Sequence, residues 1–65
     1  MTVEHVQKEV LLIEKSKGDP EAAHSYEDRL YNIVLKIIAI GAPNAKELAK
    51  AALETNKINF PRWCA

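Results

Sequence analysis

Apolar residues divide the chain into three segments with helical spacing, followed by an apolar tail. In the first segment, residues 3–16, apolar side chains recur at intervals of three and four and so share one side of a helix: Val3, Val6, Val10 and Ile13. A strand over residues 9–13 is the competing interpretation. The helical spacing covers more residues, so we predict a helix here, with Thr2 as its N-cap.

The second segment, residues 20–40, is the centre of the predicted fold. Gly18 can end the first helix, Asp19 can cap the second, and Pro20 suits the first helical position. We predict one helix here, although a break or bend near Ser25 stays open. Its inner side is expected to hold Ala23, Tyr26 or Glu27, Leu30, Val34, Ile37 and Ile38. Ile33, Leu35 and Ile40 fall on other sides, so this helix needs cover around most of its circumference.

A third helix is predicted after the turn at residues 41–44. Gly41 permits the turn, and Asn44 with Glu47 three residues later has the spacing of a capping box. The helix is expected to end at residues 55–57. Its apolar side is predicted to hold Ala45, Leu48, Ala49, Ala52 and Leu53.

The tail after the third helix is too apolar for a disordered end, because Ile58, Phe60 and Trp63 recur within six residues. We therefore predict a strap that folds back over the helices. The predicted fold class is all-α: residues 1–65 form a single domain, a small three-helix bundle closed by an aromatic C-terminal strap.

Composition narrows the possible functions. Nine basic and nine acidic residues cancel and are mixed along the chain, which argues against nucleic acid and anionic membranes as partners. Charged residues interrupt every apolar run well short of the ~20 residues of a membrane span, and they also exclude a secretory signal near residue 1. A single cysteine allows no internal disulfide, which fits the cytoplasm. His5, His24 and Cys64 are too few for structural zinc, so we expect no metal and no cofactor.

Two short motifs resemble small uncharacterised proteins of phage and bacterial genomes. They are Ala23-His24-Ser25-x-Glu27-Asp28-x-Leu30-Tyr31 and the ending Phe60-x-Arg62-Trp63-Cys64-Ala65. The resemblance covers residues 19–65 and leaves the first helix out. It implies a phage or prophage setting and implies no activity.

Candidate chemistry is sparse. His24 and Asp28, four residues apart, share a helix face close to Glu27 and could act as an acid–base pair or as part of a metal site. A solvated, salt-bridged face explains them better, since no further ligands are placed nearby. Cys64 beside Arg62 could be a reactive thiol, but no positioned base is evident, so an inert terminal thiol is expected.

Both motifs could instead have a structural use. We hypothesise that Glu27 or Asp28 holds the strap through a bidentate contact with Arg62, while Trp63 fills the core. The residues singled out for an interaction or a structural lock are His24, Glu27, Asp28, Arg62 and Trp63.

Two classes of function remain. The first is a non-enzymatic protein-interaction module, such as a phage-type accessory protein or inhibitor that binds a host or phage protein. The apolar second helix also suggests a homodimer. The alternative is a small DNA-binding regulator, with residues 20–55 as a helix-turn-helix. The candidate recognition helix mixes Lys46 and Lys50 with Glu47 and Glu54, so the first class is preferred. An enzyme is not expected, because a substrate pocket of several hundred Å³ is hard to form in 65 residues.

Overall fold

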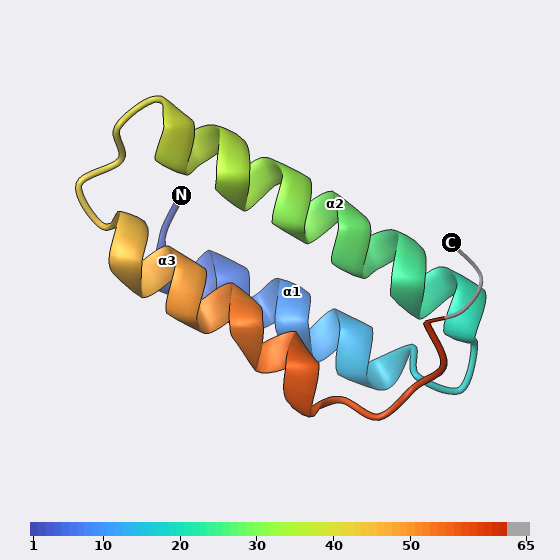
Figure 1. Ribbon diagram of the computed structural model, residues 1–65. Helices are drawn as coiled ribbons and strands as arrows, with labels where there is room; N and C mark the ends of the chain where they lie inside the picture. Colours follow the sequence, from blue (N-terminus) through green and yellow to red (C-terminus); the bar gives the residue numbers. More distant parts are fainter. Residues whose placement is uncertain (63–65) are drawn as a thin grey trace.

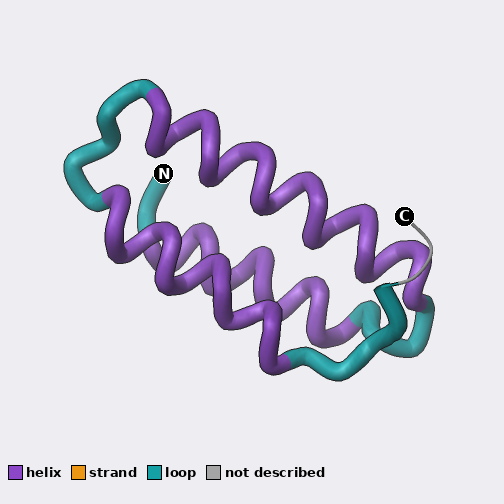
Figure 2. Tube along the Cα trace, in the orientation of Figure 1, coloured by secondary structure: helices purple, strands orange, loops and turns teal. Residues whose placement is uncertain are grey.

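The protein is a bundle of three helices, seen here in a computed structural model that describes residues 1–62 (Figure 1). Helix α1 (Val3–Lys15) is followed by α2 (Pro20–Ala39) and α3 (Ala45–Ala52), and a 3-10 turn, η1 (Leu53–Lys57), extends α3. Helix α2 runs antiparallel to both α1 and α3, which lie beside each other along it (Figures 1 and 2). No strand occurs in the described residues, so the all-α prediction is confirmed.

The first two helices begin where the sequence predicts. The Thr2 hydroxyl accepts a hydrogen bond from the His5 backbone N–H at 3.1 Å, and the Asp19 carboxylate accepts one from the Ala22 N–H at 3.3 Å. Pro20 occupies the first helical position of α2. Helix α2 continues through Ser25, so the alternative of a second start at that residue is wrong.

The predicted cap of α3 is also wrong. Asn44 precedes the helix, but its backbone has φ −102° and ψ 28°, outside the extended region in which an N-cap side chain reaches the first-turn N–H groups. Its amide instead donates a hydrogen bond to the Met1 carbonyl oxygen at 3.2 Å. Gly41 has φ +89°, a left-handed conformation that glycine adopts without strain and that lets the chain reverse between α2 and α3.

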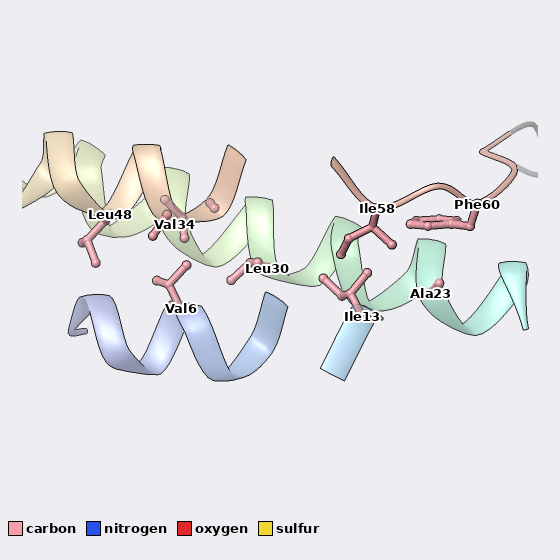
Figure 3. Packing of buried hydrophobic residues seen from close by; sticks show 10 residues of the cluster. Val6, Ile13, Ala23, Leu30, Val34, Leu48, Ile58 and Phe60 are labelled. Atoms are coloured by element: carbon pink, nitrogen blue, oxygen red, sulfur yellow. The ribbon is translucent and has the colours of Figure 1, made fainter. Parts of the chain in front are cut away.

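The core follows the predicted stripes of α1 and α2 with few changes. Its buried apolar side chains come from all three helices and from the segment after η1: Val6, Ile13, Ala23, Leu30, Val34, Leu48, Ala51, Ala52, Ile58 and Phe60 (Figure 3). Leu53 was predicted to face inward but is 56% exposed, and Ala51 is buried instead. The α-helix ends at Ala52, and the tighter 3-10 winding from Leu53 onward shifts the side-chain directions.

Helix α3 is too short to cover α2. At 1.5 Å per residue, the 20 residues of α2 extend about 30 Å and the 8 residues of α3 about 12 Å. Beyond the end of α3, Ile58 and Phe60 lie over the first half of α2, near Ala23 and Ile13 (Figure 3). Within residues 1–62, no helix has both the length and the apolarity to cross a membrane.

Candidate functional site

An ion pair between a buried carboxylate and a partly exposed guanidinium joins α2 to the C-terminal segment. Glu27 lies on the inner side of α2 and is only 5% exposed. The Arg62 Nε donates to Glu27 Oε1 at 2.9 Å, and Arg62 Nη2 donates to Oε2 at 3.0 Å. This two-pronged geometry matches the planar guanidinium to the planar carboxylate, and it gives Glu27 the partner that a buried charge requires.

The remaining Arg62 donors bind the backbone that leads up to it. Nη2 also donates to the carbonyl oxygens of Thr55 and Ile58, at 2.9 and 3.1 Å, and Nη1 donates to that of Phe60 at 3.3 Å. The guanidinium carbon lies 3.9 Å from the centre of the Phe60 ring, a cation–π contact. The hydrogen bonds to Glu27 raise the pKa of Arg62, and burial opposes this effect. We call Glu27, Arg62 and these carbonyls the Arg62 lock.

A second polar contact, between the Tyr31 and Thr55 hydroxyls, reinforces the lock. Thr55 is fully buried, so this bond satisfies a hydroxyl that water cannot reach. Neither hydroxyl was among the predicted site residues. The available signal was the spacing of Tyr31, four residues after Glu27 on the same side of α2. Every buried side-chain nitrogen and oxygen in residues 1–62 has a hydrogen-bond partner.

The three residues grouped as candidate chemistry do not act together. His24 Nδ1 lies 3.8 Å from an oxygen of Asp28, so the predicted pair is present as a long contact near the surface. Glu27 faces inward and binds Arg62 instead. Of the two carboxylates proposed as partners of Arg62, the structure therefore selects Glu27. No group of three possible metal ligands occurs among the residues that the structure describes.

Trp63 and Cys64 lie outside the described residues, so their predicted roles stay predictions. Within residues 1–62, the Arg62 lock directs its charges toward each other and toward the backbone of the same chain. A guanidinium and a carboxylate engaged in this way stabilise the position of the C-terminal segment.

An open apolar groove lies between α2 and α3. Its volume is about 260 Å³, and Leu35, one of its lining residues, is 64% exposed. The residues that line it are Tyr31, Val34, Leu35, Ile38, Ala49, Ala52 and Leu53. A groove without charged lining residues is suited to hold apolar side chains.

Comparisons with protein-family models, with curated protein sequences and with solved structures found no match.

Proposed function

We propose that this chain is a non-enzymatic protein-interaction module. The observation that carries the proposal is the set of large apolar side chains left exposed along α2 and at the start of η1. Leu35 and Leu53 border the groove, and Ile40, at the end of α2, is 81% exposed. Monomeric proteins rarely leave large contiguous apolar surface in water, and such surface usually marks a contact with another protein.

The partner, in this proposal, is a host or phage protein, and the setting is the phage or prophage context that the two sequence motifs imply. A cytoplasmic location is supported by the single cysteine. The module also associates with itself as a homodimer, because one layer of helices leaves apolar residues uncovered on more than one side of α2. Ile33 and Leu35 are both exposed, although they are two residues apart on the helix.

The C-terminal strap is the structural part of the proposal. Buried Ile58 and Phe60, together with the Arg62 lock, support a strap that continues through Trp63 and closes the bundle. Tryptophan fluorescence tests this extension, since Trp63 is the only tryptophan. A blue-shifted emission that is protected from quenchers is expected. A red-shifted, readily quenched emission would instead make Trp63 a surface contact.

The DNA-binding alternative has less support. In a helix-turn-helix the two helices meet at a steep angle of roughly 90–120°, whereas α3 runs back alongside α2 (Figure 2). Helix α3 has only eight residues, and Glu47 offsets the charge of Lys46 or Lys50. A steep loss of DNA affinity with rising salt, measured on the purified protein, would be needed to favour this alternative.

Affinity capture followed by reconstitution tests the interaction. A protein captured from host lysate is purified, and its binding to the chain is titrated by calorimetry. Ile40→Glu should weaken binding at least tenfold, because it places a charge in an apolar contact. Leu11→Glu is the matched control, since Leu11 is also an exposed apolar residue but lies on a different helix, α1. If no purified candidate binds, or if Ile40→Glu and Leu11→Glu bind alike, the proposal fails.

A further inference from the structure

We propose that the groove between α2 and α3 binds the same groove of a second copy of this chain, around a two-fold axis near Leu35. In this arrangement Asp28 of each copy pairs with Lys46 of the other. The inference deepens the proposed self-association, because it assigns that contact to one surface and one orientation.

Each row of lining residues is preceded along its wall by one charged residue, which flanks the groove and is not part of its lining. On α2, Asp28 is followed by the lining residues Tyr31, Leu35 and Ile38 at intervals of three, four and three, so all four share one side of the helix. On the other wall, Lys46 and the lining residue Ala49 lie three residues apart on α3, and the lining residue Leu53 follows at the start of η1. Both rows therefore begin with a charged residue and continue with apolar ones.

The two charges lie at opposite ends of the groove, because α2 and α3 are antiparallel (Figure 1). The hydrogen bond between Tyr31 and Thr55 sets the register of the two helices. Counting back from Thr55 along α3 places Lys46 about level with the end of α2, near Ile40. The midpoint between Asp28 and Ile40 is Val34, which is next to Leu35.

A two-fold axis at this midpoint brings opposite charges together. It places Asp28 of one copy level with Lys46 of the other, and it does so twice, once at each end of the interface. An isologous contact requires a surface that is complementary to itself, and a groove with an acidic end and a basic end meets that requirement. A parallel arrangement would instead bring like charges together.

Both charges are available for such a contact. The Asp28 side chain is 67% exposed, and one of its oxygens lies 3.8 Å from the imidazole Nδ1 of His24. Lys46 makes no ion pair within residues 1–62. Lys57 on η1 is less available for a contact between copies than Lys46, because it already binds Glu54 at 3.0 Å.

The size of the face reaches the lower bound for a specific dimer, about 1,000 Å² buried in total. Helix α2 is about 30 Å long, and α3 together with η1 is about 22 Å long. With each about 10 Å across, the flat face measures roughly 500 Å² on each copy. The whole α2–α3 face, with Leu35 and Leu53 near its centre, is therefore needed, whereas a partner confined to the groove would leave much of the face exposed.

Sedimentation equilibrium of purified variants tests the arrangement. The wild-type chain should be a dimer at micromolar concentration, and Leu35→Glu should be monomeric. Leu11→Glu, the matched control on α1, should remain dimeric. Asp28→Lys and Lys46→Asp should each weaken the dimer about tenfold, because symmetry counts each exposed pair twice. The double variant Asp28→Lys/Lys46→Asp should return to within about twofold of the wild type.

Circular dichroism verifies that each variant is folded before its mass is interpreted. A wild-type chain that stays monomeric at high micromolar concentration overturns the inference, even if a host protein binds it with high affinity. A dimer that survives Leu35→Glu, or charge reversals that do not rescue each other, also overturns it. A dimer with these responses that captures no other protein supports the inference and contradicts only the proposed partner binding.

Discussion

The carboxylate of Glu27 accepts two hydrogen bonds from the guanidinium of Arg62, 35 positions later in the chain, at 2.9 and 3.0 Å. This contact joins the inner side of α2 to the segment that covers it. Both residues belong to the motifs that looked most like candidate chemistry. Their mutual pairing explains the two residues by stability, without any ligand.

Removing Arg62 should lower the free energy of unfolding more than neutralising Glu27. Arg62→Ala leaves a buried carboxylate without a counter-charge, and we expect it to lower the free energy of unfolding by about 3 kcal/mol. Glu27→Gln should cost only about 1–2 kcal/mol, because the Arg62 side chain is 34% exposed and keeps its contacts with water and backbone carbonyls. Urea denaturation at fixed pH measures both values.

The double variant supplies the control for this prediction. In the Glu27→Gln background, Arg62→Ala leaves no buried charge behind, so it should lower the free energy of unfolding by only about 1 kcal/mol there. Lys17→Ala removes an exposed pair with Glu14 and should change stability by less than about 0.5 kcal/mol. Strictly additive costs for Glu27→Gln and Arg62→Ala would show that the two side chains do not interact.

Stability that comes from Arg62 should not change around neutral pH. The pKa of Arg62 is raised in the folded protein, first by its hydrogen bonds to Glu27. A raised pKa gives stability that is fully present below the unfolded-state value and lost only as pH rises through the folded-state value, both strongly alkaline. The difference in unfolding free energy between wild type and Arg62→Ala should thus be equal at about pH 7 and about pH 9. If the unfolding free energies of wild type and Arg62→Ala became equal by pH 9, the prediction would be contradicted.

The Tyr31–Thr55 hydroxyl pair should be worth more than an average surface hydrogen bond. Tyr31→Phe leaves the buried Thr55 hydroxyl without a partner and should cost about 1–2 kcal/mol. Adding Thr55→Val removes that orphaned hydroxyl, so the double variant should be no less stable than Tyr31→Phe alone. Thermal melts compare the two, and a clearly lower midpoint for the double variant would refute the pairing.

Helix caps offer a direct comparison between sequence and structure. Asp19→Ala should cost about 1 kcal/mol, because the Asp19 side chain binds a first-turn N–H of α2. Asn44→Ala should cost less than about 0.5 kcal/mol, because the Asn44 side chain binds only the exposed Met1 carbonyl oxygen. Denaturant midpoints test this order, and an equal loss for both would restore Asn44 as a cap.

Sequence predicted the helices well where local chemistry determines them. The spacing of Val6 and Ile13, and the Asp19-Pro20 start of α2, depend on neighbours a few residues away, and both were confirmed. The cap at Asn44 failed because its outcome depends on backbone angles set by the turn and on Met1, which is distant in sequence.

The Arg62 lock was predictable only in part. A C-terminal segment that folds back over the helices needs a contact to hold it, and the sequence predicted one between Arg62 and a carboxylate on α2. Which carboxylate it binds depends on which side of α2 faces inward, and this favours Glu27 over its neighbour Asp28. For the Tyr31–Thr55 pair, the spacing places Tyr31 on the same side of α2 as Glu27, but the identity of its partner depends on the register between α2 and η1.

Phe60 should be essential for folding. Its side chain is buried over the first half of α2, where α3 no longer provides cover, and its ring also lies under the Arg62 guanidinium. Phe60→Ala should therefore lower stability by about 3–5 kcal/mol, the usual range for a buried Phe. A domain of this size lies near the low end of the usual 5–15 kcal/mol, so most of the variant should be unfolded at 37 °C.

The matched variant Phe60→Leu separates the loss of apolar cover from the loss of the aromatic ring. Leucine keeps most of the buried volume but removes the cation–π contact, so it should cost about 1–2 kcal/mol and remain folded at 37 °C. Circular dichroism melts of the three proteins give the order wild type, Phe60→Leu, Phe60→Ala. If Phe60→Ala melts with the wild type, residues 58–62 do not cover α2 in solution, and the exposed first half of α2 becomes a further contact surface.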